Sequence, residues 1–272
     1  SGFFTAGRTA SFFDFYANDS NYTSLPGSDR GNTNLFAYTF TFGGGFSATV
    51  SAEDRIANRW WAGAAGQAMP DVVANLRVDQ AWGSAQLSGA IHEIRSADPT
   101  VGTEYGYAIQ GGLKLNLPMI AAGDVFWLQA AYGDGALDYS GAARHVSGGT
   151  FGALSSTIGA QSDAYVIGGS VKKSKAWSVV ASFVHNFTPT VQGAVYGGYG
   201  SVNNPVGGAV DFKTYAVGGR INWIPVKNFT IGTEVMYSVI DPSGTVASPT
   251  ALYATKSKYD GVTARIRFQR DF

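Results

Sequence analysis

The stretch FAYTFTF at Phe36–Phe42, followed by FSATVSA at Phe46–Ala52, shows the pattern whose repetition decides the fold of this chain. In both stretches an apolar side chain stands at every second position, and a small or hydroxylated side chain stands between. Side chains of a β-strand point alternately to its two faces, so this period of two predicts two strands with one apolar face each. Gly43–Gly45 predicts a tight turn between them, and we therefore expect a β-hairpin.

The same alternation returns with the same polarity along most of the chain. In Tyr105–Leu117 (YGYAIQGGLKLNL) the odd positions are mostly aromatic or aliphatic, whereas Gln110, Lys114 and Asn116 occupy even positions. A soluble β-sandwich would also alternate, so one segment does not distinguish the two classes. Repetition in segments of about ten residues, with aromatic side chains gathered at the segment ends, is the pattern of a transmembrane barrel.

Loop lengths support the same class of fold. We expect strands near 1–10, 33–42, 45–54, 70–79, 82–94, 105–117, 124–134, 176–187, 189–202, 211–224, 228–240 and 259–272. Tight turns alternate with long external stretches at 11–32, 55–69, 95–104, 135–175, 203–210 and 241–258. Outer-membrane barrels have short periplasmic turns and long extracellular loops, whereas a soluble barrel has no reason to sort its connections. The predicted class is therefore all-β, a transmembrane antiparallel up-and-down β-barrel.

Composition agrees with a membrane barrel and argues against other classes. Charged residues make up 14% of the chain, against roughly 25% in soluble domains. The 19 basic and 19 acidic side chains balance, so the charge does not predict nucleic acid as a partner. No apolar run approaches the roughly 18 residues of a transmembrane helix. Ser1–Phe4 does not resemble a signal peptide, so we expect any export signal to have been removed already.

Strand parity indicates which part of a barrel the chain represents. Because the last strand should end in the periplasm, 33–42 descends and 1–10 ascends. The strand-like Tyr165–Ile167 then belongs to the long external loop. A barrel that begins within an ascending strand is unexpected. We therefore expect residues 1–272 to be a single barrel domain that lacks its N-terminal strands.

Several separate motifs, in the same order along the chain, resemble a known family. They are Thr5–Arg8 with Ser11–Phe15, Ala37–Thr39 with Gly45–Thr49, Met69–Val73 and, most specifically, the closing IRFQRDF at Ile266–Phe272. These residues resemble the outer-membrane general porins of alphaproteobacteria, of the rhizobial and Brucella type. The family's N-terminal strands, including a Cys-containing segment, have no counterpart here, which agrees with the parity count.

The resemblance implies a passive diffusion channel for small hydrophilic solutes and ions in the outer membrane of a Gram-negative bacterium. It implies a homotrimer of sixteen-stranded barrels, of which about the last twelve strands are present here. It also implies contact with membrane lipids and lipopolysaccharide, no cofactor and no enzymatic activity. The third external loop of such porins folds into the channel, and residues 11–32 correspond to that pore-constricting loop.

Alternation then predicts which side chains line the pore. If the C-terminal Phe272 faces lipid, Phe268 also faces lipid, while Arg265 and Arg267 face the lumen. The same reasoning places further ionisable side chains on the pore wall, namely Arg8, Arg77, Lys114, Arg220 and Glu234. Arg270 faces outward near the periplasmic end, where it can reach the headgroups by snorkelling.

The expected constriction loop carries Asp14, Asp19, Asp29 and Arg30. Acidic side chains on an inserted loop, opposite basic side chains on the wall, would create a transverse field that orients solutes at the narrowest point. The alternative is that these residues are ordinary solvated residues of the lumen.

Other chemistries have weaker support. His92 is expected on the wet wall, His145 in a loop and His185 near a turn, and none has a second ligand at metal spacing. No serine stands beside a histidine and an orienting acid at a recognisable spacing. A membrane-embedded hydrolase and a plugged adhesive barrel therefore remain as alternatives to the channel. Conductance in a planar bilayer separates them, because only the open channel conducts.

Overall fold

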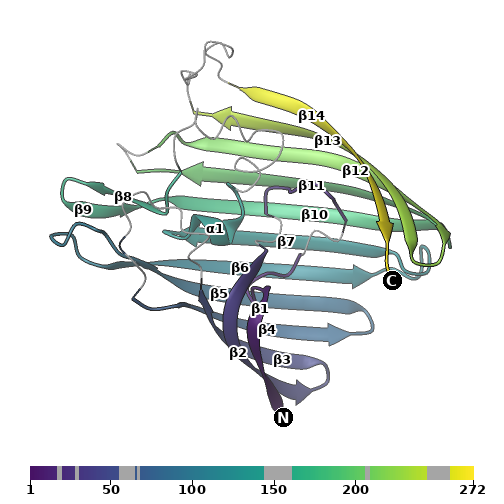
Figure 1. Cartoon of the computed structure of the whole chain (residues 1–272), viewed down its shortest axis with the longest axis horizontal. Helices are drawn as coiled ribbons and strands as arrows, with labels where there is room; N and C mark the ends of the chain where they lie inside the picture. The colour runs from purple at the N-terminus through teal and green to yellow at the C-terminus, as the bar shows by residue number, and fades with distance from the viewer. Residues whose placement is uncertain are drawn as a thin grey trace.

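A computed structural model of the chain describes residues 1–16, 20–27, 31–54, 65, 68–143, 161–205, 209–243 and 258–272. Its main element is a twelve-stranded antiparallel sheet in which each strand pairs with its neighbours in the sequence (Figure 1). The strands, in spatial order, are β1 (Gly2–Ala10), β2 (Asn32–Gly43), β3 (Phe46–Asp54), β4 (Asp71–Gln80), β5 (Gly83–Ile94), β6 (Glu104–Asn116), β7 (Val125–Asp134), β10 (Lys175–Thr188), β11 (Val191–Asn203), β12 (Phe212–Val226), β13 (Phe229–Pro242) and β14 (Tyr259–Arg270). Between β7 and β10 the chain also forms a short helix, α1 (Leu137–Ser140), and a separate hairpin of β8 (Ala164–Ile167) and β9 (Ser170–Lys173).

The predicted all-β, antiparallel up-and-down fold is confirmed. Every segment that the sequence predicts as a barrel strand forms a strand of the main sheet. The strand signal at Tyr165–Ile167 is also real, and it pairs with β9 inside the long connection, as strand parity requires. A total of sixteen strands stays a prediction.

Local sequence explains where the strands reverse. Gly43, Gly44 and Gly45 have φ angles of 87°, 62° and 81°, in the left-handed region that glycine enters without steric cost. A side chain at Gly45 would also lack space, since its Cβ would lie 1.9 Å from the carbonyl oxygen of Asp79. In the turn between β12 and β13 the left-handed residue is Asn228, with a φ of 62°.

Each strand presents polar side chains to one face of the sheet and apolar side chains to the other. On β5, Gln86 and Ser88 are buried, whereas Leu87 and Ile91 are about half exposed. Large exposed apolar side chains on the other strands include Phe36, Phe40, Val50, Leu76, Ile109, Val195, Val217, Val235 and Ile266. A soluble domain has the opposite distribution. One face therefore suits lipid and the other suits water.

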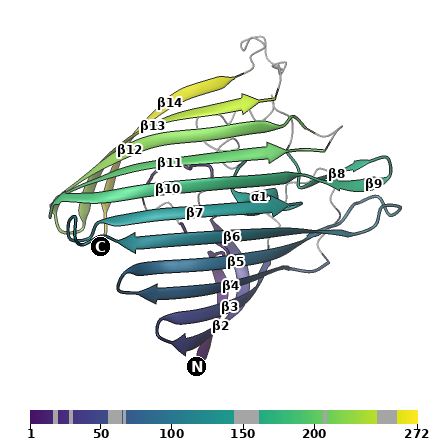
Figure 2. The same ribbon diagram turned by 180° about the vertical axis from the view of Figure 1, so that it is seen from behind.

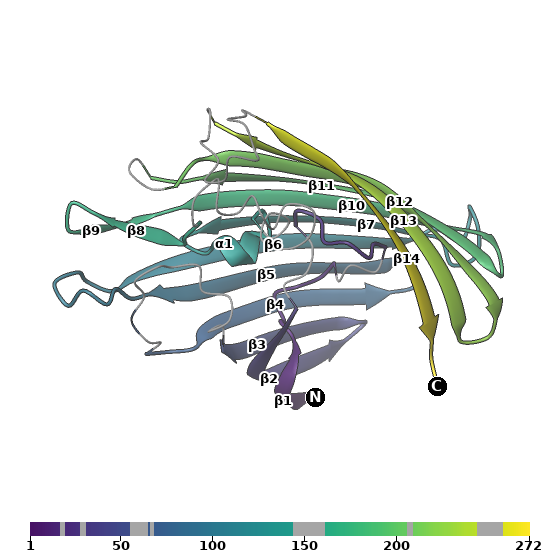
Figure 3. The same cartoon turned by 45° about the horizontal axis from the view of Figure 1, so that its top comes forward.

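The sheet is curved, and its concave side holds two segments that lie outside the sheet. Figures 1 and 2 show α1 and the chain after β1 on the same side of the strands, and Figure 3 shows the curvature. We call the concave side the inner face and the opposite side the outer face. In the described sheet, β1 and β14 are the edge strands, each paired with a single neighbour. Within the described ranges, no helix is long and apolar enough to cross a bilayer.

Candidate functional site

The first inward segment, described at residues 11–16 and 20–27, lies across the inner face of the sheet. Gln129 on β7 holds it twice: its Oε1 accepts a hydrogen bond from the Tyr16 N–H (2.7 Å), and its Nε2 donates to the Gly27 carbonyl (2.6 Å). Similar bonds join Glu53 and Asn75 to the main chain of Phe12, Gln110 to that of Phe13, and Gln86 to that of Asp14. Because wall side chains satisfy its main-chain groups, the segment has a defined path across the sheet.

Aromatic side chains fill the space between this segment and the wall. The rings of Phe15 and Tyr16 lie edge-on to Trp127 of β7, with centroid separations of 5.4 and 5.8 Å. Leu25 is fully buried in the same apolar cluster. Aromatic pairs of this geometry contribute about 0.5–1.5 kcal/mol beyond the burial of their area. The segment is therefore packed onto the wall.

Tyr22 is the point where this segment meets the charged part of the wall. Its N–H donates to Glu234 of β13 (2.5 Å), and its carbonyl accepts from Arg265 of β14 (2.6 Å). The guanidinium carbons of Arg220 and Arg267 lie 5.0 and 5.1 Å from the ring centroid, within cation–π range. Four charged residues that the sequence predicts for the wall thus converge on a tyrosine that sequence reasoning did not identify.

Strand register explains this convergence. Arg220 on β12 lies directly opposite Glu234 on β13, and Glu234 lies directly opposite Arg265 on β14. Cross-strand partners share one face of a sheet, so the three side chains form a row of alternating charge on the inner face. Aligning the predicted strands could have revealed this row. The contact with Tyr22 depends on the path of a distant loop, so no local pattern encodes it.

Arg77 and Lys114 also lie on the inner face, as predicted. The guanidinium carbon of Arg77 lies 5.5 Å from the ring centroid of Phe15, and Arg77 Nε is 2.7 Å from a carboxylate oxygen of Asp79. Lys114 Nζ lies 4.9 Å from the ring centroid of Trp127. Both residues occupy the ends of their strands that lead into short turns. On the short-turn side, Arg77 therefore contacts the first inward segment, and Lys114 contacts the wall tryptophan on which that segment packs.

The remaining predicted residues have different outcomes. Asp14 lies within the first inward segment and is partly buried. Asp19, Asp29 and Arg30 lie outside the described residues. Phe268 is exposed on the outer face and Phe272 is fully exposed after β14. Arg270 reaches the Lys227 carbonyl (3.4 Å) at the short-turn end, close to where snorkelling would bring it.

The register corrects the expected orientation of Arg8. Arg8 pairs with Asn34 of β2, which shares its face with the outward-pointing Phe36. Arg8 therefore lies on the outer face, at the long-loop end of β1, rather than on the pore wall. A shift of one residue in strand register moves every side chain to the opposite face.

A second inward segment, residues 135–143, corrects another expectation. The sequence predicts an external loop over 135–175, but all four residues of α1 are buried on the inner face. The ring of Tyr139 lies edge-on to Phe13 of the first segment, with centroids 5.0 Å apart. The two segments also meet where the Gly27 N–H donates to the Gly141 carbonyl (3.1 Å). Glycine, alanine and leucine occupy six of the nine positions, which favours burial, although Asp138 is buried as well.

The histidines are more constrained than the sequence suggests. His92 lies on the inner face of β5, as expected, but it is buried beside Asp71 (2.9 Å) and Asp163 (3.5 Å) and is not in contact with water as a wet-wall residue would be. His185 contacts Asp124 (2.6 Å), and His145 lies outside the described residues. Among the residues that the structure describes, no group of three or more His, Cys, Asp or Glu could hold a metal ion.

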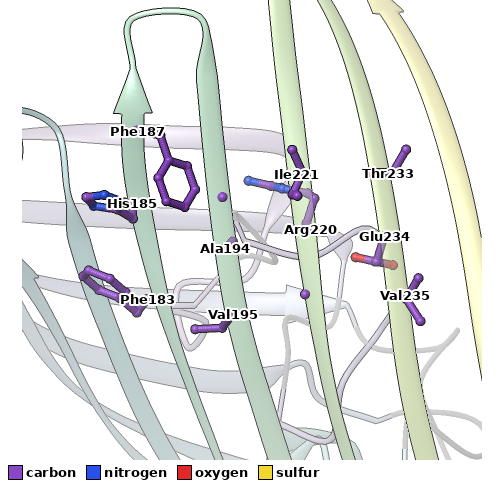
Figure 4. Close-up of a pocket in the computed structure, with 12 residues that line it drawn as sticks. Phe183, His185, Phe187, Ala194, Val195, Arg220, Ile221, Thr233, Glu234 and Val235 are labelled. Atoms are coloured by element: carbon purple, nitrogen blue, oxygen red, sulfur yellow. The ribbon is translucent and has the colours of Figure 1, made fainter.

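Two hollows mark the outer face of the sheet. One, of about 590 Å³, lies over β3–β6, and the other, of about 520 Å³, lies over β10–β13. Figure 4 shows the second hollow, with Phe183, Phe187, Ile221 and Val235 among its lining residues. Both hollows have apolar linings on the side that suits lipid, so neither is a candidate site for hydrophilic solutes.

Comparison with known proteins identifies the family. A model of the Porin subfamily matches residues 2–264. The chain belongs to this porin family. Among curated proteins, no sequence matches it significantly.

Solved structures match this porin chain over nearly its whole length. The outer membrane channel DcaP of Acinetobacter baumannii is 15% identical, with a TM-score of 0.69, and the match covers 97% of this chain and 71% of that one. For the anion-selective porin from Comamonas acidovorans the values are 13%, 0.57, 98% and 73%. For OmpT of Vibrio cholerae they are 8%, 0.55, 98% and 76%. At these identities the likeness extends to the fold alone, and it agrees with the family assignment of an outer-membrane porin.

Proposed function

We propose that residues 11–32 form the constriction of a water-filled pore, where size and charge select small hydrophilic solutes and ions during passive diffusion. Membership of a porin family supports the channel itself. The convergence of Arg220, Glu234, Arg265 and Arg267 on Tyr22 carries the assignment of the constriction. A segment held across a polar wall narrows the path that water and solutes can take.

Charge at this constriction would come from both the segment and the wall. Asp14 belongs to the segment, while Arg77 and Lys114 contact the aromatic cluster that packs it onto the wall. Charges of opposite sign across a narrow pore create a transverse field, and walls of low dielectric strengthen that field. We include Asp19, Asp29 and Arg30 of the same loop in the proposed constriction.

We further propose that the protein is a general porin of the alphaproteobacterial type and works as a homotrimer. The support is the set of sequence motifs, above all IRFQRDF at Ile266–Phe272. Its partners would be membrane lipids, lipopolysaccharide and the permeating solutes. Native mass spectrometry of the protein from outer membranes tests the assembly, since a mass other than that of three copies would contradict it.

Planar-bilayer recording tests the channel function directly. We expect stepwise insertion events with ohmic conductance in the open state, because an open aqueous pore passes ions in proportion to voltage. Absence of such conductance would overturn the channel in favour of a plugged adhesive barrel. Loss of an esterase activity on changing a lumen serine or histidine would favour a hydrolase.

Reversal potentials in a salt gradient test the charge of the constriction. Asp14→Asn should shift the reversal potential toward anion preference, because it removes a negative charge from the narrowest part of the path. Asp98→Asn is the matched control, since Asp98 lies in an exposed loop and bonds the neighbouring Thr100. An unchanged reversal potential in Asp14→Asn would remove Asp14 from the constriction.

A further inference from the structure

His92, near the long-loop end of β5, is buried between two carboxylates. Its Nδ1 lies 2.9 Å from Asp71 Oδ1, and its Nε2 lies 3.5 Å from Asp163 Oδ2. The side chains of His92, Asp71 and Asp163 are only 6%, 0% and 3% exposed. Burial of carboxylates is costly unless they are paired and hydrogen-bonded. Such a cluster persists only where its partners are held in place.

The partners of both carboxylates lie on the second inward segment. The Tyr139 hydroxyl donates to Asp71 Oδ2 (2.6 Å), and the Leu137 N–H donates to Asp163 Oδ1 (2.6 Å). Asp71 belongs to the wall, whereas Asp163 lies on the returning part of the same long connection. We call Asp71, His92, Asp163 and Tyr139 the His92 cluster. It ties α1 to the wall through both carboxylates.

Apolar contacts extend the second inward segment across the curve of the sheet. Tyr139 packs on one side with Val73, Ala90 and Ala108, from the inner faces of β4, β5 and β6. On the other side the segment belongs to an apolar cluster that begins on β10 and continues to β14. These contacts join Leu137, Ala142 and Ala143 to Ala176, Val202, Phe212, Ile240 and Tyr259. The segment therefore bridges the apolar clusters on the two sides of β7.

This bridge lies on the long-loop side of the first inward segment. Asp71 is the first residue of β4, at the long-loop end, whereas Asn75, which binds the first segment, lies further along that strand. The two segments contact each other at Gly27 and Gly141. The second segment therefore lies nearer the long-loop ends of the strands than the first segment.

We propose that the second inward segment is a further constriction of the pore, and that the His92 cluster is the latch that holds it there. His92 and Asp163 are positioning residues in this scheme, and α1 is the element that limits solute size. The inference rests on the proposed channel function. It adds an entrance filter, in series with the charged constriction at Tyr22.

The test uses the double variant Tyr139→Phe/Asp163→Ala in the protein purified from outer membranes. It removes both hydrogen bonds that α1 donates to the carboxylates of Asp71 and Asp163. If two comparable constrictions lie in series, loss of one should raise single-channel conductance about twofold. Liposome swelling should accelerate more for a tetrasaccharide than for a monosaccharide. Asp98→Ala, in an exposed loop, is the matched control and should change neither measurement.

A disulfide provides the reverse experiment. The 272 residues contain no cysteine, and a Cβ at Gly200 of β11 would lie 3.0 Å from the Cβ of Ala142. A small outward shift brings this pair to the roughly 3.5–4.5 Å of a disulfide. In the double variant, Ala142→Cys/Gly200→Cys should restore wild-type conductance when oxidised and lose this effect on reduction. A merely misfolded barrel would not respond to reduction in this way.

The possible outcomes distinguish failure of the proposed latch from failure of the proposed channel. If the wild type conducts and the double variant keeps the same conductance and solute range, the latch is overturned and the channel stands. If the wild type does not conduct, the channel function fails first. If the double variant does not insert into membranes, Ala142→Cys/Gly200→Cys in the wild-type background tests the position of the second inward segment. Failure of that pair to crosslink would overturn the position of the segment.

Discussion

At the scale of single residues, Tyr22 explains how the wall can hold several cations close together. Arg220 and Arg267 lie near its ring, and Arg265 binds its carbonyl. Three guanidinium groups in a narrow space repel one another unless they share partners. Glu234 supplies one negative charge, and the ring supplies cation–π attraction of about 0.5–2 kcal/mol per cation. The tyrosine therefore helps to set the position of charge in the pore.

Replacing Tyr22 should change ion preference in proportion to the loss of its ring. Tyr22→Ala frees Arg220 and Arg267 to extend into the lumen, so the reversal potential should move toward anions. Tyr22→Phe keeps the ring and loses only the hydrogen bond from the hydroxyl to Asn222 (2.6 Å), worth about 1 kcal/mol. It should leave the reversal potential nearly unchanged. Equal shifts in the two variants would contradict the role of the ring.

At the scale of elements, the strands were predictable because each carries its own signal. A lipid-facing strand must alternate, so Tyr105–Leu117 could be assigned without knowledge of any other segment. The same parity correctly put Lys114 and Arg220 on the inner face. Residues 135–143 carry no such period, and their burial depends on contacts with strands far away in the sequence. Local sequence pattern therefore predicts the strands of the wall better than the segments that pack against their inner face.

The alternation of β3 predicts a large difference between its two faces. Val50 lies at the middle of the strand and is exposed on the outer face. Val50→Arg would place a charge in lipid, so it should lower the free energy of unfolding by about 2–4 kcal/mol. Ser47→Arg, on the inner face of the same strand, should change it much less. Urea titration in lipid vesicles measures both, and similar losses would contradict the assigned faces.

Asp124, in the turn between β6 and β7, binds Asn186 close to the turn between β10 and β11. Its titration should affect the free energy of unfolding. Burial alone would raise the pKa of Asp124, but hydrogen bonds from the Asn186 N–H (2.9 Å) and His185 (2.6 Å) outweigh it and hold this pKa below its ordinary value of 3.8. A lowered carboxyl pKa stabilises the fold above the ordinary value, and the effect is lost as pH falls through the lowered value.

Comparison of the wild type with Asp124→Asn measures this contribution. The urea midpoints of the two proteins should differ most at about pH 7, where the carboxylate is fully charged. The difference should shrink as the pH falls below 3.8, the ordinary pKa of the group. A difference that persists unchanged in strong acid would show that the charge of Asp124 is not responsible.

At the scale of the whole molecule, the separation of polar and apolar faces can be tested with single cysteines. Leu87 and Val217 lie on the outer face, whereas Ser47 and Gln269 lie on the inner face, and each is replaced by cysteine in turn. A charged maleimide should react in vesicles with the inner pair only, because water fills the pore. A neutral, lipid-soluble maleimide should also react with the outer pair. Labelling of Leu87→Cys by the charged reagent would contradict the barrel orientation.

The alternation along each strand also has a consequence for biogenesis. In an extended chain, the aromatic side chains of Phe36–Phe42 are separated by the small or hydroxylated side chains of Ala37, Thr39 and Thr41. Alternation of this kind prevents a strand from forming a long continuous apolar stretch. A translocation machine that retains apolar helices of about 20 residues would find nothing to retain. The chain can therefore travel through an inner membrane and an aqueous compartment. Its apolar outer face forms only when the strands assemble into the sheet in the outer membrane.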